Sequence, residues 1–338
     1  MKFFRSILIL GILSLLLAEE DPMGSMTIEY GGHDIIELGK AYTKQQYVDQ
    51  NYYENVIEFV QAGNQLSKRG EFSEAILRFQ HALDNDSTYI FAHNGLGNAY
   101  LKLNDLDKAE KYFKKAIKFG PTYAFPYNNL ANLYLMKGEK DKARSNLETA
   151  LKYDPNSAYI NYNLGNIYLK NDDPTMAQYY FNKAVDKDPG FCNARYNLAI
   201  AYKHMKWDGK AIAEYKELVD ICPGHAKGVL NLAAYYIQSN KVEQALVLYR
   251  QAVIINPDTE LYLALGHAYH NAGYNQKEIE AYRSAVNSDS SNIDAKYYLA
   301  LAYYEQDMIF SSKQLIDEIL LTNPDDSKTL ELKKKINL

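Results

Sequence analysis

Few residues in this sequence combine the type and the spacing that chemistry requires. His267 and His270 lie three residues apart, so a helix would place both imidazoles on one face, where they could hold a metal ion. No carboxylate or cysteine follows at the next turn to complete such a site. We therefore expect two solvated histidines, no bound metal and no other cofactor.

The two cysteines offer a different chemistry. We expect Cys192 to open one helix and Cys222 to end the next, and antiparallel helices bring those two ends together. In an oxidising compartment a disulfide across this ~30-residue loop could add on the order of 3 kcal/mol of stability. The bridging geometry is strict, so we expect two unpaired, buried thiols, with the disulfide as the alternative.

Motifs of nucleotide and hydrolytic enzymes are missing from the sequence. There is no phosphate-binding loop, no HExxH and no GxSxG, and Gly95-Leu96-Gly97 falls inside an expected helix instead of a strand-to-helix turn. The 42 acidic and 37 basic side chains leave a net charge of −5, which argues against a nucleic-acid surface built from clustered Lys and Arg. We expect no enzymatic activity and no nucleic-acid partner.

The elements that position these residues follow from an internal repeat of 34 residues. The repeat is carried by columns of alanine (Ala75, Ala109, Ala143, Ala177, Ala211, Ala245), proline (Pro121, Pro155, Pro189, Pro223, Pro257) and tyrosine (Tyr100, Tyr134, Tyr168, Tyr202, Tyr236). Within a unit, Leu130 and Tyr134 share one helical stripe, and Ala143 and Leu147 share another. A proline closes the second helix because it cannot donate the next backbone hydrogen bond. Each unit is therefore expected to be a pair of amphipathic helices.

These columns, together with the Leu-Gly or Leu-Ala pairs such as Leu164-Gly165 and Leu130-Ala131, resemble the signature of the tetratricopeptide repeat family. The resemblance implies an all-α fold, a right-handed α-solenoid superhelix of antiparallel helix pairs. The departures are local. Glu278 and Ser312 occupy the small-residue position of the last two units, and Ser87 and Ser290 replace proline.

The repeat predicts the domain organisation. Eight units span residues 56–89, 90–123, 124–157, 158–191, 192–225, 226–258, 259–292 and 293–326, and a capping helix covers 327–338. Residues 34–55 echo the motif and are expected to form a capping helix or a degenerate repeat. Residues 19–33 are polar and rich in glycine, which is typical of a flexible linker.

The amino terminus has the pattern of a secretory signal. Lys2 and Arg5 precede an apolar stretch at residues 7–18, and acidic residues end it. The stretch is short of the ~20 residues that span a bilayer, so residues 1–18 are expected to be a signal peptide, with a membrane anchor at 7–18 as the alternative and the only membrane contact. Met-Gly-Ser-Met at 23–26 is typical of a cloning junction, which would make the leader an added segment. We expect an exported protein, periplasmic or secreted.

The face of each first helix opposite its core stripe is where the resemblance places a concave, ligand-binding groove. Two asparagine columns follow that face, Asn64, Asn98, Asn132 and Asn166 in one and Asn129, Asn163, Asn197 and Asn231 in the other. Amides donate and accept, so a regular ladder of them could bond to the backbone of an extended peptide of any sequence. The alternative is that these amides serve neighbouring helices or water.

Aromatic side chains share this face, namely Phe91, Phe125, Tyr159, Tyr162 and Tyr196. Exposed aromatics at a concavity favour recognition, although these could also pack against one another. The leading hypothesis is an exported, non-enzymatic scaffold that binds an extended peptide segment or partner protein in its groove, in cell-envelope assembly or secretion. The alternative is a carbohydrate-binding protein of a polysaccharide export system, in which Tyr162 and Tyr196 would stack on sugar rings.

Overall fold

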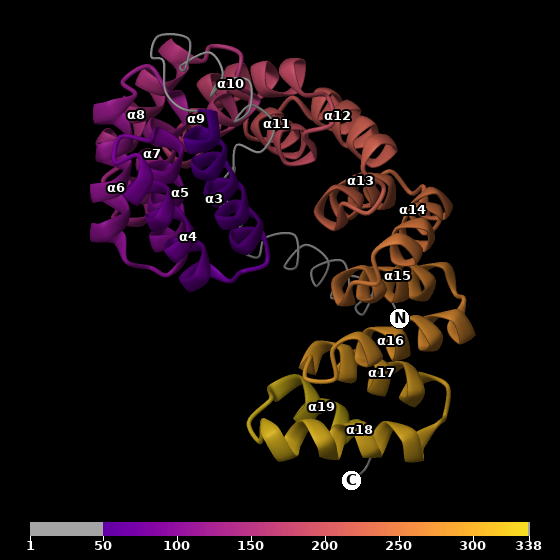
Figure 1. Ribbon diagram of the computed structural model, residues 1–338. Coiled ribbons are helices and arrows are strands. Elements are labelled where there is room, and N and C mark those ends of the chain that lie inside the picture. The colour runs from indigo at the N-terminus through magenta and orange to yellow at the C-terminus, as the bar shows by residue number, and fades with distance from the viewer. Residues whose placement is uncertain (1–49, 337–338) are drawn as a thin grey trace. The chain divides into compact units, whose positions relative to one another are not determined.

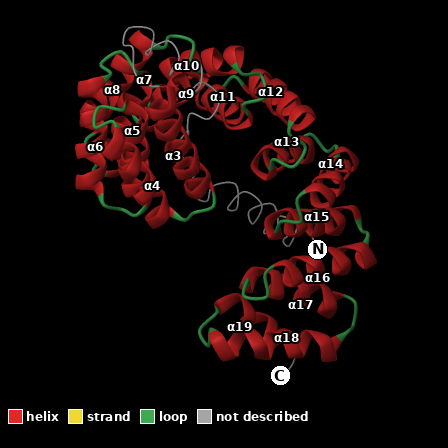
Figure 2. Ribbon diagram, viewed as in Figure 1, coloured by secondary structure: helices red, strands yellow, loops and turns green. Residues whose placement is uncertain are grey.

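The computed structural model describes residues 50–336, and the regular elements of that range are all α-helices (Figure 2). The expected signal or anchor at 1–18, the linker at 19–33 and most of the segment at 34–55 lie outside the described residues. Within the described range, none of the helices is both long enough and apolar enough to cross a bilayer. The chain divides into two compact parts, with the boundary in sequence between residues 191 and 192.

The first part consists of four helix pairs, shown from indigo to magenta in Figure 1. The pairs are α3 (Gln50–Lys68) with α4 (Phe72–Asn85), α5 (Ile90–Lys102) with α6 (Leu106–Phe119), α7 (Ala124–Met136) with α8 (Lys140–Tyr153), and α9 (Ala158–Lys170) with α10 (Pro174–Lys187). Each helix packs against its partner, and the second helix of each of the first three pairs also packs against the first helix of the next pair. Residues 50–55, expected in a separate cap, instead form the beginning of α3.

The second part repeats the same arrangement. Its pairs are α11 (Cys192–His204) with α12 (Asp208–Ile221), α13 (Ala226–Gln238) with α14 (Val242–Ile255), α15 (Thr259–Ala272) with α16 (Asn275–Ser288), and α17 (Ile293–Glu305) with α18 (Ile309–Thr322). A further helix, α19 (Ser327–Lys335), packs against α17 and α18. These helices run in Figure 1 from rose to yellow.

The turn inside each pair contains one residue with left-handed backbone geometry. Three of these residues are glycines, with φ of 82° at Gly70, 78° at Gly138 and 76° at Gly273. The other turns use side-chain-bearing residues with φ of 58° to 60°, namely Asn104, Asp172, Lys206, Asn240 and Asp307. The left-handed region costs a residue with a Cβ atom about 1–2 kcal/mol, and Asn and Asp tolerate it best because they bond locally. The sequence therefore places a suitable residue type in most of the turns.

Close approach between paired helices depends on the small-residue columns. Ala109, Ala143 and Ala177 have no exposed surface. A Cβ atom added at Gly97 on α5 would lie 2.4 Å from the Phe113 ring on α6, so only glycine fits against that ring as it stands. One repeat later the corresponding residues are Ala131 and Leu147, both buried in one core cluster. In these two repeats the smaller residue on the first helix accompanies the larger side chain on the second.

Candidate functional site in the first helices

Most of the asparagines expected to face a groove are buried. The exposed fraction is 1% for Asn98, 3% for Asn132, 4% for Asn166 and 1% for both Asn129 and Asn163, and Asn231 is also buried. Asn64 and Asn197 are half-buried. The expectation that both columns occupy exposed positions is therefore wrong for six of the eight.

The burial has a cause in the packing of α5, α7 and α9. Every residue is buried at 90–99 in α5, at 128–134 in α7 and at 160–167 in α9, so all sides of these helices lie within the protein. The sequence pattern predicted one core direction per helix. It could not predict that the opposite side would also be covered.

Amide side chains connect neighbouring repeats across this buried layer. Asn129 donates from Nδ2 to Oδ1 of Asn94 at 3.0 Å, which joins α7 to α5. Asn163 donates from Nδ2 to Oδ1 of Asn128 at 2.7 Å, which joins α9 to α7. At Asn129 and Asn163 the amide nitrogen therefore serves the neighbouring helix.

The same layer contains amide atoms that remain without a partner. Among the described residues, no hydrogen bond reaches Oδ1 of Asn98, Asn129 or Asn163, or Nδ2 of Asn132. A buried polar atom without a partner costs about 1–3 kcal/mol, so such atoms in a native protein call for an explanation, for example a bound water or ligand. Three of these atoms are acceptors and one is a donor. A peptide backbone offers N–H groups that could bond to the acceptors and C=O groups that could bond to the donor.

The aromatic side chains divide into two groups. Phe91 and Tyr162 are only 7% and 2% exposed, so the expectation of exposed aromatics is wrong for these two. They pack against other rings instead, with Phe91 5.2 Å from Tyr123 and Tyr162 4.8 Å from Phe191 between ring centroids. The burial of Tyr162 also removes a ring that the carbohydrate hypothesis needs at the surface.

Phe125, Tyr159 and Tyr196 are half-buried. Each has an aromatic neighbour in its own part of the chain, with centroid distances of 5.3 Å from Phe125 to Tyr123, 4.8 Å from Tyr159 to Phe191 and 5.2 Å from Tyr196 to His225. These three side chains are the predicted site aromatics that retain an accessible edge.

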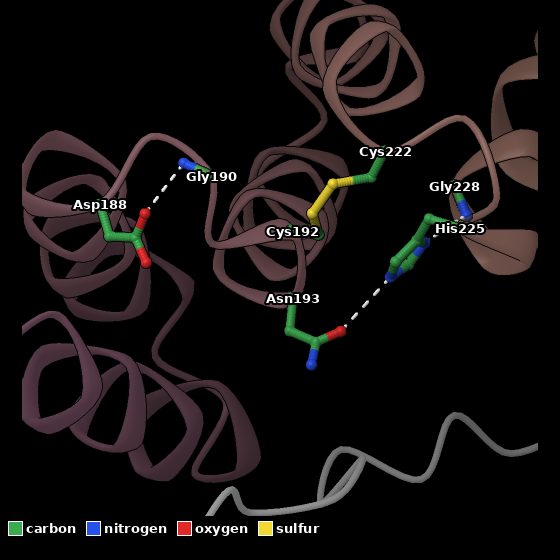
Figure 3. The surroundings of a disulfide bond; sticks show 7 residues. All are labelled: Asp188, Gly190, Cys192, Asn193, Cys222, His225 and Gly228. Atoms are coloured by element: carbon green, nitrogen blue, oxygen red, sulfur yellow. Dashed lines mark hydrogen bonds between the residues drawn. A yellow bond between two sulfur atoms is a disulfide. The ribbon is translucent and has the colours of Figure 1, made fainter. Parts of the chain in front are cut away.

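The two cysteines are joined by a disulfide, so the expectation of two unpaired thiols is wrong (Figure 3). Cys192 begins α11 and Cys222 directly follows α12, and their Cα atoms are 6.4 Å apart, within the usual range for a bridge. His225 lies beside the bridge, where its Nδ1 accepts a hydrogen bond from the backbone N–H of Gly228 at 3.0 Å. Burial lowers the pKa of His225. The first pair of the second part is therefore closed covalently at its ends.

Of the two histidines of α15, His267 is buried, so the expectation of a solvated side chain is wrong for it, whereas the side chain of His270 is 31% exposed. His267 is 2% exposed, its Nδ1 is hydrogen-bonded to the Tyr282 hydroxyl at 2.7 Å, and burial lowers its pKa to about 3. Nδ1 of His270 lies 2.9 Å from Oε1 of Glu278 and 3.5 Å from Oε2 of Glu305.

The two carboxylates beside His270 were not predicted because α16 and α17 supply them, not the next turn of α15. One signal was present in the sequence. Glu278 occupies the small-residue position that alanine fills in earlier units, and a charged residue at such a buried position requires a partner.

Comparison with known families and structures agrees with the architecture. Models of the tetratricopeptide repeat match residues 90–123, 128–191, 193–225 and 259–292, and a TPR repeat model matches residues 63–104. Together these matches cover more than half of the chain. No curated protein matches it.

The chain is also similar to several solved structures at low sequence identity. The PilF protein of Pseudomonas aeruginosa is 18% identical with a TM-score of 0.55, over 62% of this chain and 95% of that one. A tetratricopeptide repeat protein from Parabacteroides merdae is 18% identical with a TM-score of 0.48, over 74% and 99%. YrrB, described as a TPR protein with an unusual peptide-binding site, is 23% identical with a TM-score of 0.44, over 58% and 97%. On its repeat signature, its helix pairs and these family matches, the chain belongs to the tetratricopeptide repeat family.

Proposed function

We propose that this chain is a non-catalytic scaffold that binds an extended segment of a partner protein along the first helices of its repeats. The observation that carries the proposal is the set of partnerless amide atoms on α5, α7 and α9, at Asn98, Asn129, Asn132 and Asn163. An extended segment presents backbone N–H and C=O groups at regular spacing. Such groups could satisfy these atoms whatever the side chains of the segment.

The burial of these amides restricts how the partner segment can bind. The atoms lie beneath the surface, so the bound segment must enter the buried layer to reach them. Half-buried Phe125 and Tyr159 stand on α7 and α9 near the start of each helix and offer apolar contact to an entering side chain. A segment with aromatic or apolar residues and an accessible backbone fits this surface best.

Two features support export of the scaffold. The leader at residues 1–18 has the charge and apolar pattern of a secretory signal. The Cys192–Cys222 disulfide suits an oxidising compartment, because reducing compartments keep most thiols unpaired. We extend the proposal accordingly to an exported scaffold in cell-envelope assembly or secretion.

The test is photo-crosslinking in cells that express the full chain, with a photoreactive phenylalanine analogue in place of Phe125 and mass spectrometry of what it captures. The double variant Asn98→Ala, Asn132→Ala removes two partnerless amide atoms and disturbs little of the fold, because Asn132 makes only one long bond, at 3.5 Å from Asn163. Loss of two ligand bonds of about 0.5–1.5 kcal/mol each should weaken capture roughly tenfold. Helicity by circular dichroism should stay the same.

The matched control is the double variant Asn85→Ala, Asn146→Ala. Both residues are half-buried, and their amides donate only solvent-exposed hydrogen bonds to carbonyls of their own helices, at His81 and Lys142. The control should retain full capture. Equal capture by the two double variants would assign the buried amides to architecture and end the proposal.

A further inference from the structure

The sharpest departure from the repeat pattern lies in the seventh helix pair. Six earlier pairs place alanine at the start of the second helix, from Ala75 to Ala245, and each of these alanines has no exposed surface. The seventh pair has Glu278 there, and its side chain is 6% exposed. Placing a carboxylate in this position is costly unless partners or a cation compensate its charge.

The surroundings of Glu278 bring three ligand atoms together from three helices. Nδ1 of His270 on α15 is 2.9 Å from Oε1 of Glu278 on α16 and 3.5 Å from Oε2 of Glu305 on α17. All three ligand atoms lie within 4.8 Å of one another. Around a metal with bonds of about 2.1 Å, neighbouring ligand atoms are about 3.0–3.4 Å apart, so the histidine lies at coordination spacing from both carboxylates.

The charge balance of the cluster also favours a cation. Two carboxylates face one imidazole, and among residues 50–336 neither Glu278 nor Glu305 has a Lys or Arg partner within ion-pair distance. A divalent ion bound to neutral imidazole would compensate both negative charges.

We propose that His270, Glu278 and Glu305 form a binding site for a divalent transition-metal ion. One imidazole nitrogen and two carboxylate oxygens suit Zn²⁺ and similar ions, whereas Ca²⁺ and Mg²⁺ prefer oxygen ligands alone. Three protein ligands leave at least one coordination position for water or for a group of a partner. His267 is not a member of this group of ligand atoms, and its Nδ1 is hydrogen-bonded to Tyr282.

The bound ion would connect two neighbouring repeats. His270 and Glu278 belong to the seventh pair and Glu305 to the eighth, so the metal would link α15, α16 and α17 in addition to their apolar contacts. Because the ion binds only where all three helices are in place, it should stabilise the end of the repeat array by mass action.

The experiment is Zn²⁺ titration of the metal-free full chain by calorimetry, with thermal unfolding at saturating Zn²⁺ and in chelator. Wild type should bind one ion and unfold a few degrees higher with it. Glu278→Ala restores the residue of the other repeats, so this variant should fold at least as well as metal-free wild type and bind Zn²⁺ roughly 100-fold more weakly. Retained folding separates loss of the site from loss of the protein.

His204→Gln is the matched control, since His204 is an exposed histidine at the end of α11 outside the cluster. This variant should bind Zn²⁺ as wild type does. A Co²⁺ absorption band that disappears in Glu278→Ala and in Glu305→Gln would support the same three ligands. Binding that persists in Glu278→Ala, or that disappears in His204→Gln, would overturn the proposal, as would the absence of any binding by wild type.

Discussion

His93 shows at the residue scale how burial on all sides of a first helix affects a titratable group. The side chain is 2% exposed, its Nε2 lies 2.9 Å from the carbonyl oxygen of Ser87, and its ring stacks on Phe119 at 5.4 Å between centroids. Burial lowers the pKa of His93 because the charged imidazolium loses its hydration. The folded protein therefore holds this side chain in its neutral form below the pH at which a free histidine protonates.

This lowered pKa predicts a loss of stability in mild acid. Below pH ~6.5 His93 becomes protonated in the unfolded chain but stays neutral in the folded chain. The free energy of unfolding is therefore highest above that pH and declines as the pH falls toward the pKa of His93 in the folded protein. We expect His93→Gln to reduce the slope of the unfolding free energy against pH by up to about 1.4 kcal/mol per pH unit, which corresponds to one proton. Denaturant titrations at pH 7.5, 6.5 and 5.5 measure this slope.

The control for this prediction is His81→Gln, which removes an imidazole whose side chain is 56% exposed. The comparison is decided by the difference between the two pH slopes. If His93→Gln had the same slope as wild type, then burial of the neutral imidazole would contribute nothing to acid sensitivity.

At the scale of the element, the helix pair follows directly from the sequence, because the columns of Ala, Tyr and Pro recur at one step and each residue type has a local reason for its place. The all-α repeat fold is accordingly confirmed. The candidate site is less predictable. One amphipathic period marks a single core direction, whereas Asn129 bonds to Asn94 in the preceding repeat, a contact that depends on how two repeats stack.

The group formed by His270, Glu278 and Glu305 was not predictable for the same reason. His270 lies on α15, but its carboxylate partners lie on α16 and α17, so the spacing of residues along one helix does not reveal them. The substitution of a repeat's small residue by Glu278 was visible in the sequence. The identity of its partners was not.

The contact between Gly97 and Phe113 predicts a coupled pair of substitutions. Gly97→Ala would place a methyl group 2.4 Å from the Phe113 ring, and such overpacking costs about 1–3 kcal/mol, which outweighs the gain in helix propensity of at most about 1 kcal/mol. Phe113→Leu in the same chain recreates the Ala131–Leu147 combination of the next repeat and should restore much of the loss. Urea unfolding of both single variants and the double variant gives the coupling energy.

A coupling energy near zero would contradict this account of the small-residue column. So would a Gly97→Ala variant that is more stable than wild type, since helix propensity would then outweigh the contact with the ring. Gly70→Ala is a poor comparison because Gly70 has a positive φ, so its effect comes from the backbone and not from packing.

At the scale of the whole molecule, each of the two parts is a series of helix pairs that contact mainly their sequence neighbours. Stability in such an array is close to a sum of repeat terms and nearest-neighbour interfaces, so a local change should affect nearby pairs most. The disulfide at Cys192 and Cys222 closes α11 and α12 and is the natural place to test this locality.

We expect Cys192→Ser, Cys222→Ser to weaken the second part by about 2–4 kcal/mol through the greater freedom of its unfolded loop. Amide hydrogen exchange followed by mass spectrometry should show faster opening of α11 and α12, with α5 and α6 unchanged. Reduced wild type should behave like the variant. Faster exchange spread evenly over all described helices would show that the array unfolds as one cooperative unit.

The same disulfide also limits how far the polypeptide can be drawn out under load. Its cysteines are separated by 30 residues, and an extended chain gains about 3.5 Å per residue, so the bond withholds roughly 100 Å of contour length. A tethered molecule stretched in an optical trap would reach that additional length only after a reducing agent has cleaved the bridge. The redox conditions of the compartment thereby determine the maximum length to which the protein can be extended.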